Sequence, residues 1–161
     1  MGSFILNLAP YFWMVCFFTL LAGLLTRLDK SSLITLTIWL VSGLLMDKIA
    51  PLLMEVEDKR IARTLWYQTW VVIDIACIAL ILLTHKQFQL AVSKFTLMVS
   101  TTYLALMIVQ GARYIDRMVL KTDLLSTFYM YAVPVLNIGV MVFGLVWLLK
   151  NLHQSKGNTG S

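Results

Sequence analysis

The chain is poor in charged residues. Asp, Glu, Lys and Arg account for 13% of its 161 residues, whereas about 25% is usual in soluble domains. A globular surface in water needs more charge than this, so an ordinary soluble domain is excluded. Hydrophobic residues account for 60% of the chain, and this share predicts an integral membrane protein.

Residues that build metal and catalytic sites are also scarce. The sequence has two cysteines and two histidines, and it contains no GxSxG, HExxH or CxxC motif and no glycine-rich phosphate loop. Cys16 and Cys77 lie inside apolar runs, and His85 and His153 stand alone at segment ends. We therefore expect no disulfide, no metal site, no cofactor and no enzymatic activity.

The basic residues do not form a continuous patch. The formal net charge is +5, but Lys and Arg lie in small groups at the ends of apolar runs. This placement is typical of lipid-headgroup anchors and topology signals. We therefore expect a lipid bilayer around the protein and no nucleic-acid partner.

Five segments have the length of a membrane span, for which about 20 predominantly apolar residues are needed. The sequence therefore predicts an all-α integral membrane protein, a bundle of about five transmembrane helices in one domain, residues 1–161, without a soluble domain. The predicted spans are 4–26, 32–54, 64–84, 89–110 and 124–149, and the charged links are 55–63 and 111–123.

The second span is the least regular of the five. It opens at Ser31 and Ser32, which are candidate helix caps, and it is interrupted by Asp47 and Pro51. Either the helix continues through Pro51 with a kink, or it stops and leaves four spans with an interfacial amphipathic segment over residues 47–63. We favour the continuous helix.

Link lengths predict the topology. The links after the first and third spans are only a few residues long, so each of these pairs forms an antiparallel hairpin, and the two charge-rich links lie together at the other end. Basic residues divide almost evenly between the two ends. The first span has its basic flank at its C-terminal end, which favours an outside N-terminus and an inside C-terminus in a bacterial inner (plasma) membrane.

Asp74 lies midway along the third predicted span. A carboxylate at the bilayer centre costs roughly 2.5–3.5 kcal/mol, whereas each Leu, Ile or Val returns about 0.3–0.6 kcal/mol. Such a residue normally faces a bundle interior, a partner charge or a hydrated cavity, and helical spacing places Tyr67, Trp70 and Cys77 on its face. Asp74 is therefore a candidate for an ion or proton role. The alternative is a protonated or hydrogen-bonded Asp that fixes helix packing.

A polar stripe runs along the fourth predicted span in alternating steps of four and three residues. A period of about 3.5 suits left-handed packing against a neighbouring helix, where hydroxyl groups form hydrogen bonds. We favour packing. The other interpretation is that the stripe lines a hydrated path beside Asp74 when several copies assemble. The stripe consists of Gln89, Ser93, Thr96, Ser100, Tyr103, Met107, Gln110, Tyr114 and Arg117.

The fifth span contains Pro134, which frees the carbonyl group of Met130 from helix hydrogen bonding, and Asn137 follows one turn later. Such a pair can coordinate a cation or form a hinge, although a neighbouring helix or a water more often satisfies it. The candidate residues for an ion or proton path, or for polar packing, are Asp74, Tyr67, Ser93, Thr96, Ser100, Tyr103, Gln110 and Asn137.

The charged links carry opposite charges at helical spacing, for example Glu55 with Lys59 and, a little wider, Asp116 with Lys121. We expect solvated helix extensions that dock a soluble or membrane protein partner. The candidate docking residues are Glu55, Lys59, Arg60, Arg113, Asp116 and Arg117.

Five helices fill their own centre with side chains, so we expect function to require a homo-oligomer or a larger complex. The leading hypothesis is a non-enzymatic multi-pass membrane subunit that forms an ion- or proton-conducting or membrane-permeabilising pore. The first alternative is a small proton-coupled carrier or exporter, in which Asp74 binds a cationic substrate or couples protons. The second is a membrane sensor or scaffold that docks a soluble partner.

Overall fold

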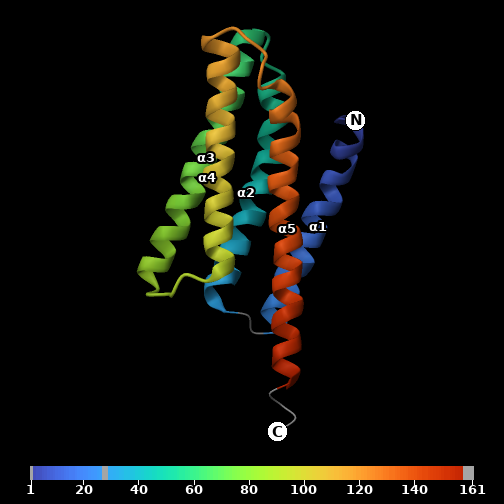
Figure 1. Ribbon diagram of the computed structural model, residues 1–161, viewed down its shortest axis with the longest axis vertical. Helices are drawn as coiled ribbons and strands as arrows, with labels where there is room; N and C mark the ends of the chain where they lie inside the picture. Colours follow the sequence, from blue (N-terminus) through green and yellow to red (C-terminus); the bar gives the residue numbers. More distant parts are fainter. Residues whose placement is uncertain (1, 27–28, 158–161) are drawn as a thin grey trace.

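A computed structural model describes residues 2–26 and 29–157, and within these residues the protein is all-helical (Figure 1). A π-helical turn, η1, continues the fourth helix, and the described chain has no strand. The helices are α1 (Gly2–Leu25), α2 (Lys30–Met54), α3 (Lys59–Gln87), α4 (Lys94–Tyr114), η1 (Ile115–Val119) and α5 (Ser126–Gly157).

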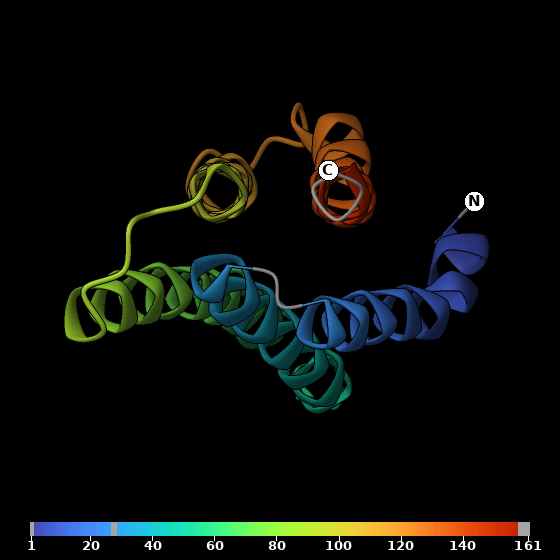
Figure 2. The same cartoon turned by 90° about the horizontal axis from the view of Figure 1, so that it is seen from below.

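The helices run alternately up and down in two layers. Figure 2 shows α1, α2 and α3 side by side in one layer and α4 and α5 in the other. Helices α1 and α3 end at the lower end of the bundle in Figure 1, whereas the links 55–58 and 120–125 lie together at the upper end. The predicted hairpins and the shared end of the two charge-rich links are therefore confirmed.

Four helices are long and apolar enough to cross a membrane: Lys30–Met54, Lys59–Gln87, Lys94–Val119 and Ser126–His153. Their outward faces carry exposed aliphatic side chains, such as Leu82, Leu83 and Val135. Outer faces of this kind suit acyl chains and are costly in water. The helices thus suggest a membrane location. Within α1, the residues with described side chains, Trp13–Leu25, form a shorter apolar helix.

Helix α2 continues through Pro51 to Met54, as predicted, so residues 47–63 do not form a separate interfacial segment. The predicted caps are wrong. The carboxylate of Asp29 accepts the backbone N–H of Ser32 at 2.9 Å and caps the helix. The hydroxyl groups of Ser31 and Ser32 are therefore free to bond to other helices.

The link between α3 and α4 lies later in the chain than predicted, because α3 continues to Gln87 and α4 begins at Lys94 instead of residue 89. The end of α3 is a Schellman motif, in which the N–H of Leu90 bonds to the carbonyl of His85 at 3.0 Å. Gln89 adopts a φ of 49° at the position where glycine is usual. Without a glycine the sequence carries no stop signal here.

The charged links are shorter than predicted. Residues 55–58 separate α2 from α3, and the Asp58 carboxylate caps α3 by accepting the N–H of Arg60 at 2.7 Å. Glu55 lies beyond the end of α2 and Lys59 opens α3, so the predicted pairing of these two residues along one helix is wrong. The predicted extension of the fourth span is confirmed as far as Val119.

Gly43 allows α1 and α2 to pack closely. The indole ring of Trp13 occupies the space where a side chain at position 43 would begin, and its Nε1–H donates to the carboxylate of Asp47 one turn later on α2. A methyl group at position 43 would overlap the ring.

We predict that Gly43→Ala lowers the free energy of unfolding by about 1–3 kcal/mol, because the added methyl group overpacks this contact. Gly111→Ala is the matched control, since nothing lies within 4 Å of a Cβ there, and better helix propensity should stabilise it by up to about 1 kcal/mol. Denaturation in mixed micelles measures both. The cost at position 43 should vanish in a Trp13→Ala background; a cost that persists there would contradict the proposed clash.

Candidate functional site in the bundle interior

Asp74 lies near the middle of α3 and faces the interior, with 1% of its surface exposed. Tyr67, Trp70, Cys77 and Ile81 are buried on the same face, as the spacing of three and four residues predicts. The carboxyl group is therefore enclosed by protein and does not meet acyl chains.

Polar side chains from α2 and α4 meet in the bundle interior, where both helices pack against α3. The Tyr103 hydroxyl donates to the Ser42 hydroxyl at 2.7 Å, because Ser42 donates its own hydrogen to the carbonyl of Trp39 at 2.9 Å. Cys77, one turn along α3 from Asp74, is buried in the same core cluster as Tyr103. We call Ser42, Asp74, Cys77 and Tyr103 the central polar group.

Within the part of the chain that the structure describes, Asp74 Oδ1 is buried without a hydrogen-bond partner. Leaving a polar atom unpaired in low dielectric costs about 1–3 kcal/mol, and more if the group is ionised. A negative charge here therefore has a high free energy, and taking up a proton or a cation would lower it. The arrangement can bind and release a positive charge.

A hydrogen-bonded network joins α2, α3 and α4 at the lower end. His85 Nδ1 lies 2.7 Å from the carbonyl of Ile81, so it carries the hydrogen and Nε2 accepts the hydroxyl of Ser31 at 2.7 Å. The Ser31 and Thr96 hydroxyl groups are 2.8 Å apart. The remaining contacts join Thr35 to Thr96 at 2.8 Å, Ser32 to Ser93 at 2.9 Å and Ser93 to Thr96 at 3.0 Å.

Aromatic residues join α3, α4 and α5 near the upper end. The Tyr129 hydroxyl donates to Gln110 Oε1 at 2.8 Å and accepts from the indole of Trp66 at 3.4 Å. The rings of Tyr67 and Tyr129 meet edge to face, with centroids 5.9 Å apart. Tyr67 and Gln110, both candidates from the sequence, therefore lie in one cluster, separate from the central polar group.

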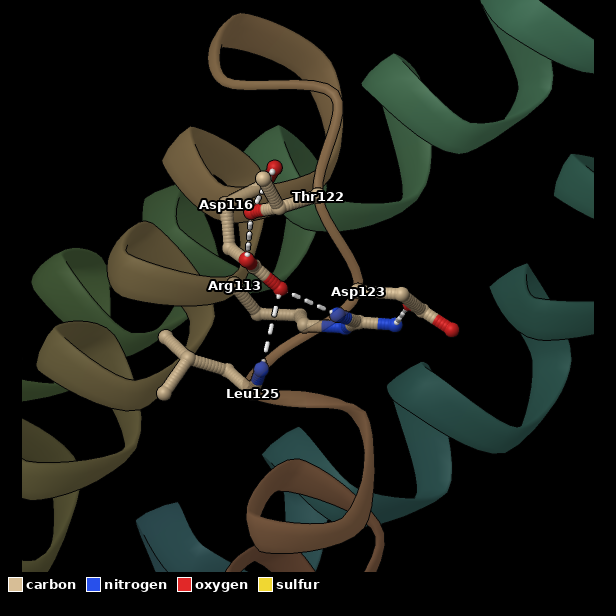
Figure 3. Close-up of polar contacts among 5 residues, drawn as sticks. All are labelled: Arg113, Asp116, Thr122, Asp123 and Leu125. Atoms are coloured by element: carbon tan, nitrogen blue, oxygen red, sulfur yellow. Dashed lines mark hydrogen bonds and ion pairs between the residues drawn. The ribbon is translucent and has the colours of Figure 1, made fainter.

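A charged clasp holds the chain between α4 and α5 (Figure 3). The Arg113 guanidinium bonds to the carboxylates of Asp116 and Asp123, and Asp116 also accepts the Thr122 hydroxyl and the N–H of Leu125. Arg113 and Asp116 are each 3% exposed.

The burial of Arg113 and Asp116 corrects the predicted docking surface. These residues are not part of a solvated helix extension, and Asp116 pairs with Arg113 instead of Lys121. Of the other candidate docking residues, Glu55, Lys59 and Arg60 are exposed and Arg117 is half-buried.

The polar stripe of α4 faces the interior of a single bundle. Thr96, Tyr103 and Gln110 are buried and bond to α2 or α5, and Ser100 is half-buried. These buried members of the stripe therefore pack within one bundle, and a path formed by several copies stays a prediction. The three buried members, Thr96, Tyr103 and Gln110, lie seven residues apart, or about 10 Å along the helix axis. Buried apolar side chains fill the levels between them, including Ile81, Val99 and Leu106.

The amide of Asn137 bonds within its own helix, donating Nδ2–H to the carbonyl of Val133 at 3.0 Å. Among the described residues, Asn137 has no hydrogen bond to the central polar group. Below Pro134, α5 packs through apolar contacts, in which Phe143 stacks on Phe95 with ring centroids 6.4 Å apart and Val140 is fully buried.

Several polar residues of the interior were missed from the sequence. Ser31, Thr35 and Ser42 recur on α2 at helical spacing, which is a signal like the stripe of α4. His85 lies three turns after Asp74 on the same face of α3, so extending that face would have found it. The inward direction of Arg113 and Asp116 has no such signal, because it depends on the path of residues 120–125.

Comparison of the chain with family models, with curated proteins and with solved structures gives no match.

We predict that Arg113→Gln lowers the free energy of unfolding by more than a surface substitution does, because it leaves the Asp116 carboxylate without its cation. Arg117→Gln, one turn later and half-buried, is the control and should change stability by about 0.5 kcal/mol or less. Denaturation of both variants in mixed micelles tests the difference. Equal losses would show that the clasp has no special role.

Proposed function

We propose that the protein is a non-enzymatic multi-pass membrane protein that carries protons, or a cation exchanged for them, and that Asp74 is the group that takes up and releases the charge. The observation that carries the proposal is the buried Asp74 carboxyl group, whose Oδ1 has no hydrogen-bond partner among the described residues. Intramembrane carboxylates in a bundle interior commonly mark ion and proton routes.

A carrier fits the interior better than an open pore. The apolar levels of Ile81 and Val99 on one side of Asp74, and of Leu106 on the other, are packed with buried side chains. A continuous water column would need these levels to be open, whereas a carrier exposes its site to one side at a time. The central polar group comes from one chain, so the proposal does not require copies to assemble around an axis.

We propose that α1 is a fifth transmembrane span, because it packs beside α2 and α5. With five spans the chain ends on the side opposite to its start, and the basic flank of the first span favours an outside N-terminus in a bacterial inner membrane. Cysteine accessibility at positions 57 and 153, measured in intact cells and in inverted vesicles, tests this orientation.

We predict that Asp74→Asn slows proton uptake by about tenfold or more, because an amide cannot take up and release a proton near neutral pH. The wild-type rate should saturate as the proton gradient is increased. The uptake rate and its saturation can be measured in proteoliposomes that contain a pH-sensitive dye and carry an imposed potassium potential. Asp74→Glu keeps the ionisable group and should retain part of the rate.

The free energy of unfolding of Asp74→Asn distinguishes a transport role of Asp74 from a role in helix packing. Asp74 Oδ1 makes no hydrogen bond with the described residues, so Asp74→Asn should leave the free energy of unfolding unchanged or raise it. Glu57→Gln, in the exposed upper link, is the charge-matched control and should transport normally. Normal uptake by Asp74→Asn would refute the proposal, and a non-saturating rate would favour a pore over a carrier.

A further inference from the structure

We propose that a pocket at the upper end of the bundle binds the phosphate group of an anionic phospholipid. The pocket has a volume of about 360 Å³ and lies between the first turns of α3, the turn η1 and the start of α5. Three cationic side chains line it, from Lys59, Arg63 and Arg117. This site is distinct from Asp74 and does not depend on the transport proposal.

The three cations have no acidic partner among the described residues. Lys59 and Arg63 are one turn apart on α3, and like charges at this spacing repel each other. The ion pairs of the described chain belong to Arg113, and Asp58 is directed at the N-terminal N–H groups of its own helix. An anion in the pocket would relieve the repulsion.

The guanidinium groups suit a phosphate. Arginine presents planar pairs of N–H donors that match two phosphate oxygens, and lysine adds a point charge. Basic pockets between transmembrane helices hold anionic headgroups, most often on the cytoplasmic side, and the same charge attraction acts on the outer side, where the proposed orientation places this pocket.

The apolar part of the pocket favours a lipid over a soluble phosphate. Trp66, Tyr67 and Tyr129 line its wall together with the cations, and Trp and Tyr are typical of the headgroup level of a bilayer. Met54, at the end of α2, also lines the pocket and is exposed. A headgroup bound among the cations would thus have its acyl chains against apolar side chains.

Native mass spectrometry of the full chain in detergent tests the proposal, with phosphatidylglycerol and phosphatidylcholine supplied at equal concentrations. We expect the wild type to retain phosphatidylglycerol about tenfold or more over phosphatidylcholine, since each basic residue near an anionic lipid contributes about fivefold. The combined Lys59→Gln, Arg63→Gln and Arg117→Gln variant should lose this preference.

The matched control neutralises three cations of the lower end, Lys30→Gln, Lys86→Gln and Lys94→Gln, and should keep the preference. The charge-conserving variant Lys59→Arg, Arg63→Lys, Arg117→Lys should keep most of it. If the neutral upper variant does not fold, Arg117→Gln alone replaces it, with an expected loss of about fivefold.

Three results would overturn the proposal. The first is an equal loss in the upper and lower variants, which would indicate general surface charge. The second is a wild type that does not distinguish the two lipids. The third is binding of inorganic phosphate or glycerol 3-phosphate to the pocket without retention of phosphatidylglycerol, which would identify a soluble phosphate as the ligand.

Discussion

The structure depends on one constraint, which is that polar side chains inside an apolar helix bundle must find their partners within the bundle. Helix α4 brings a polar residue inward at every second turn, and α2 or α5 supplies its partner: Thr35 for Thr96, Ser42 for Tyr103 and Tyr129 for Gln110. In water these contacts would contribute little, but a bilayer offers no alternative partner. The three contacts therefore set the register of α4 against its neighbours.

Two aspartates show opposite solutions to the same constraint. Asp116 is buried, and its charge is paired with Arg113 and bonded to Thr122 and the backbone of Leu125. Asp74 is buried as deeply, yet its Oδ1 has no partner in the described chain. A fully bonded carboxylate fixes a local structure, whereas an unbonded one changes its free energy strongly when it gains or loses a proton. The two carboxyl groups therefore differ in bonding although both are buried.

The helical class and the topology could be predicted from the sequence, because run length and hydrophobicity decide which segments can cross a bilayer. The inward face of α3 was also predictable from spacing alone, since Tyr67, Trp70 and Cys77 lie on the same side of the helix as Asp74. The end of α3 could not be predicted. Gln89 adopts there a conformation that glycine normally adopts, so the sequence gives no signal for this boundary.

The direction of charged side chains at helix ends could not be predicted either. Arg113 and Arg117 are one turn apart on a charged segment, yet Arg113 is buried in the clasp and Arg117 lines a pocket. This difference comes from the path of the following link, which brings Thr122 and Asp123 back toward α4. Spacing along one helix contains no information about a segment that folds over it. The stripe of α4 illustrates the same limit, because its period indicates a packed face without saying which helix covers it.

The way α5 is attached has a consequence for motion. Hydrogen bonds join α2, α3 and α4 into one frame. Helix α5 is bonded to this frame by Tyr129 near its upper end. Below Pro134 it packs on the frame through apolar contacts, such as that of Phe143 with Phe95. Apolar surfaces slide over one another without breaking directional bonds, and the proline weakens the helix between the two halves. The lower half of α5 can therefore rock away from the frame at the least cost in polar contacts, which would make it the moving wall of the bundle.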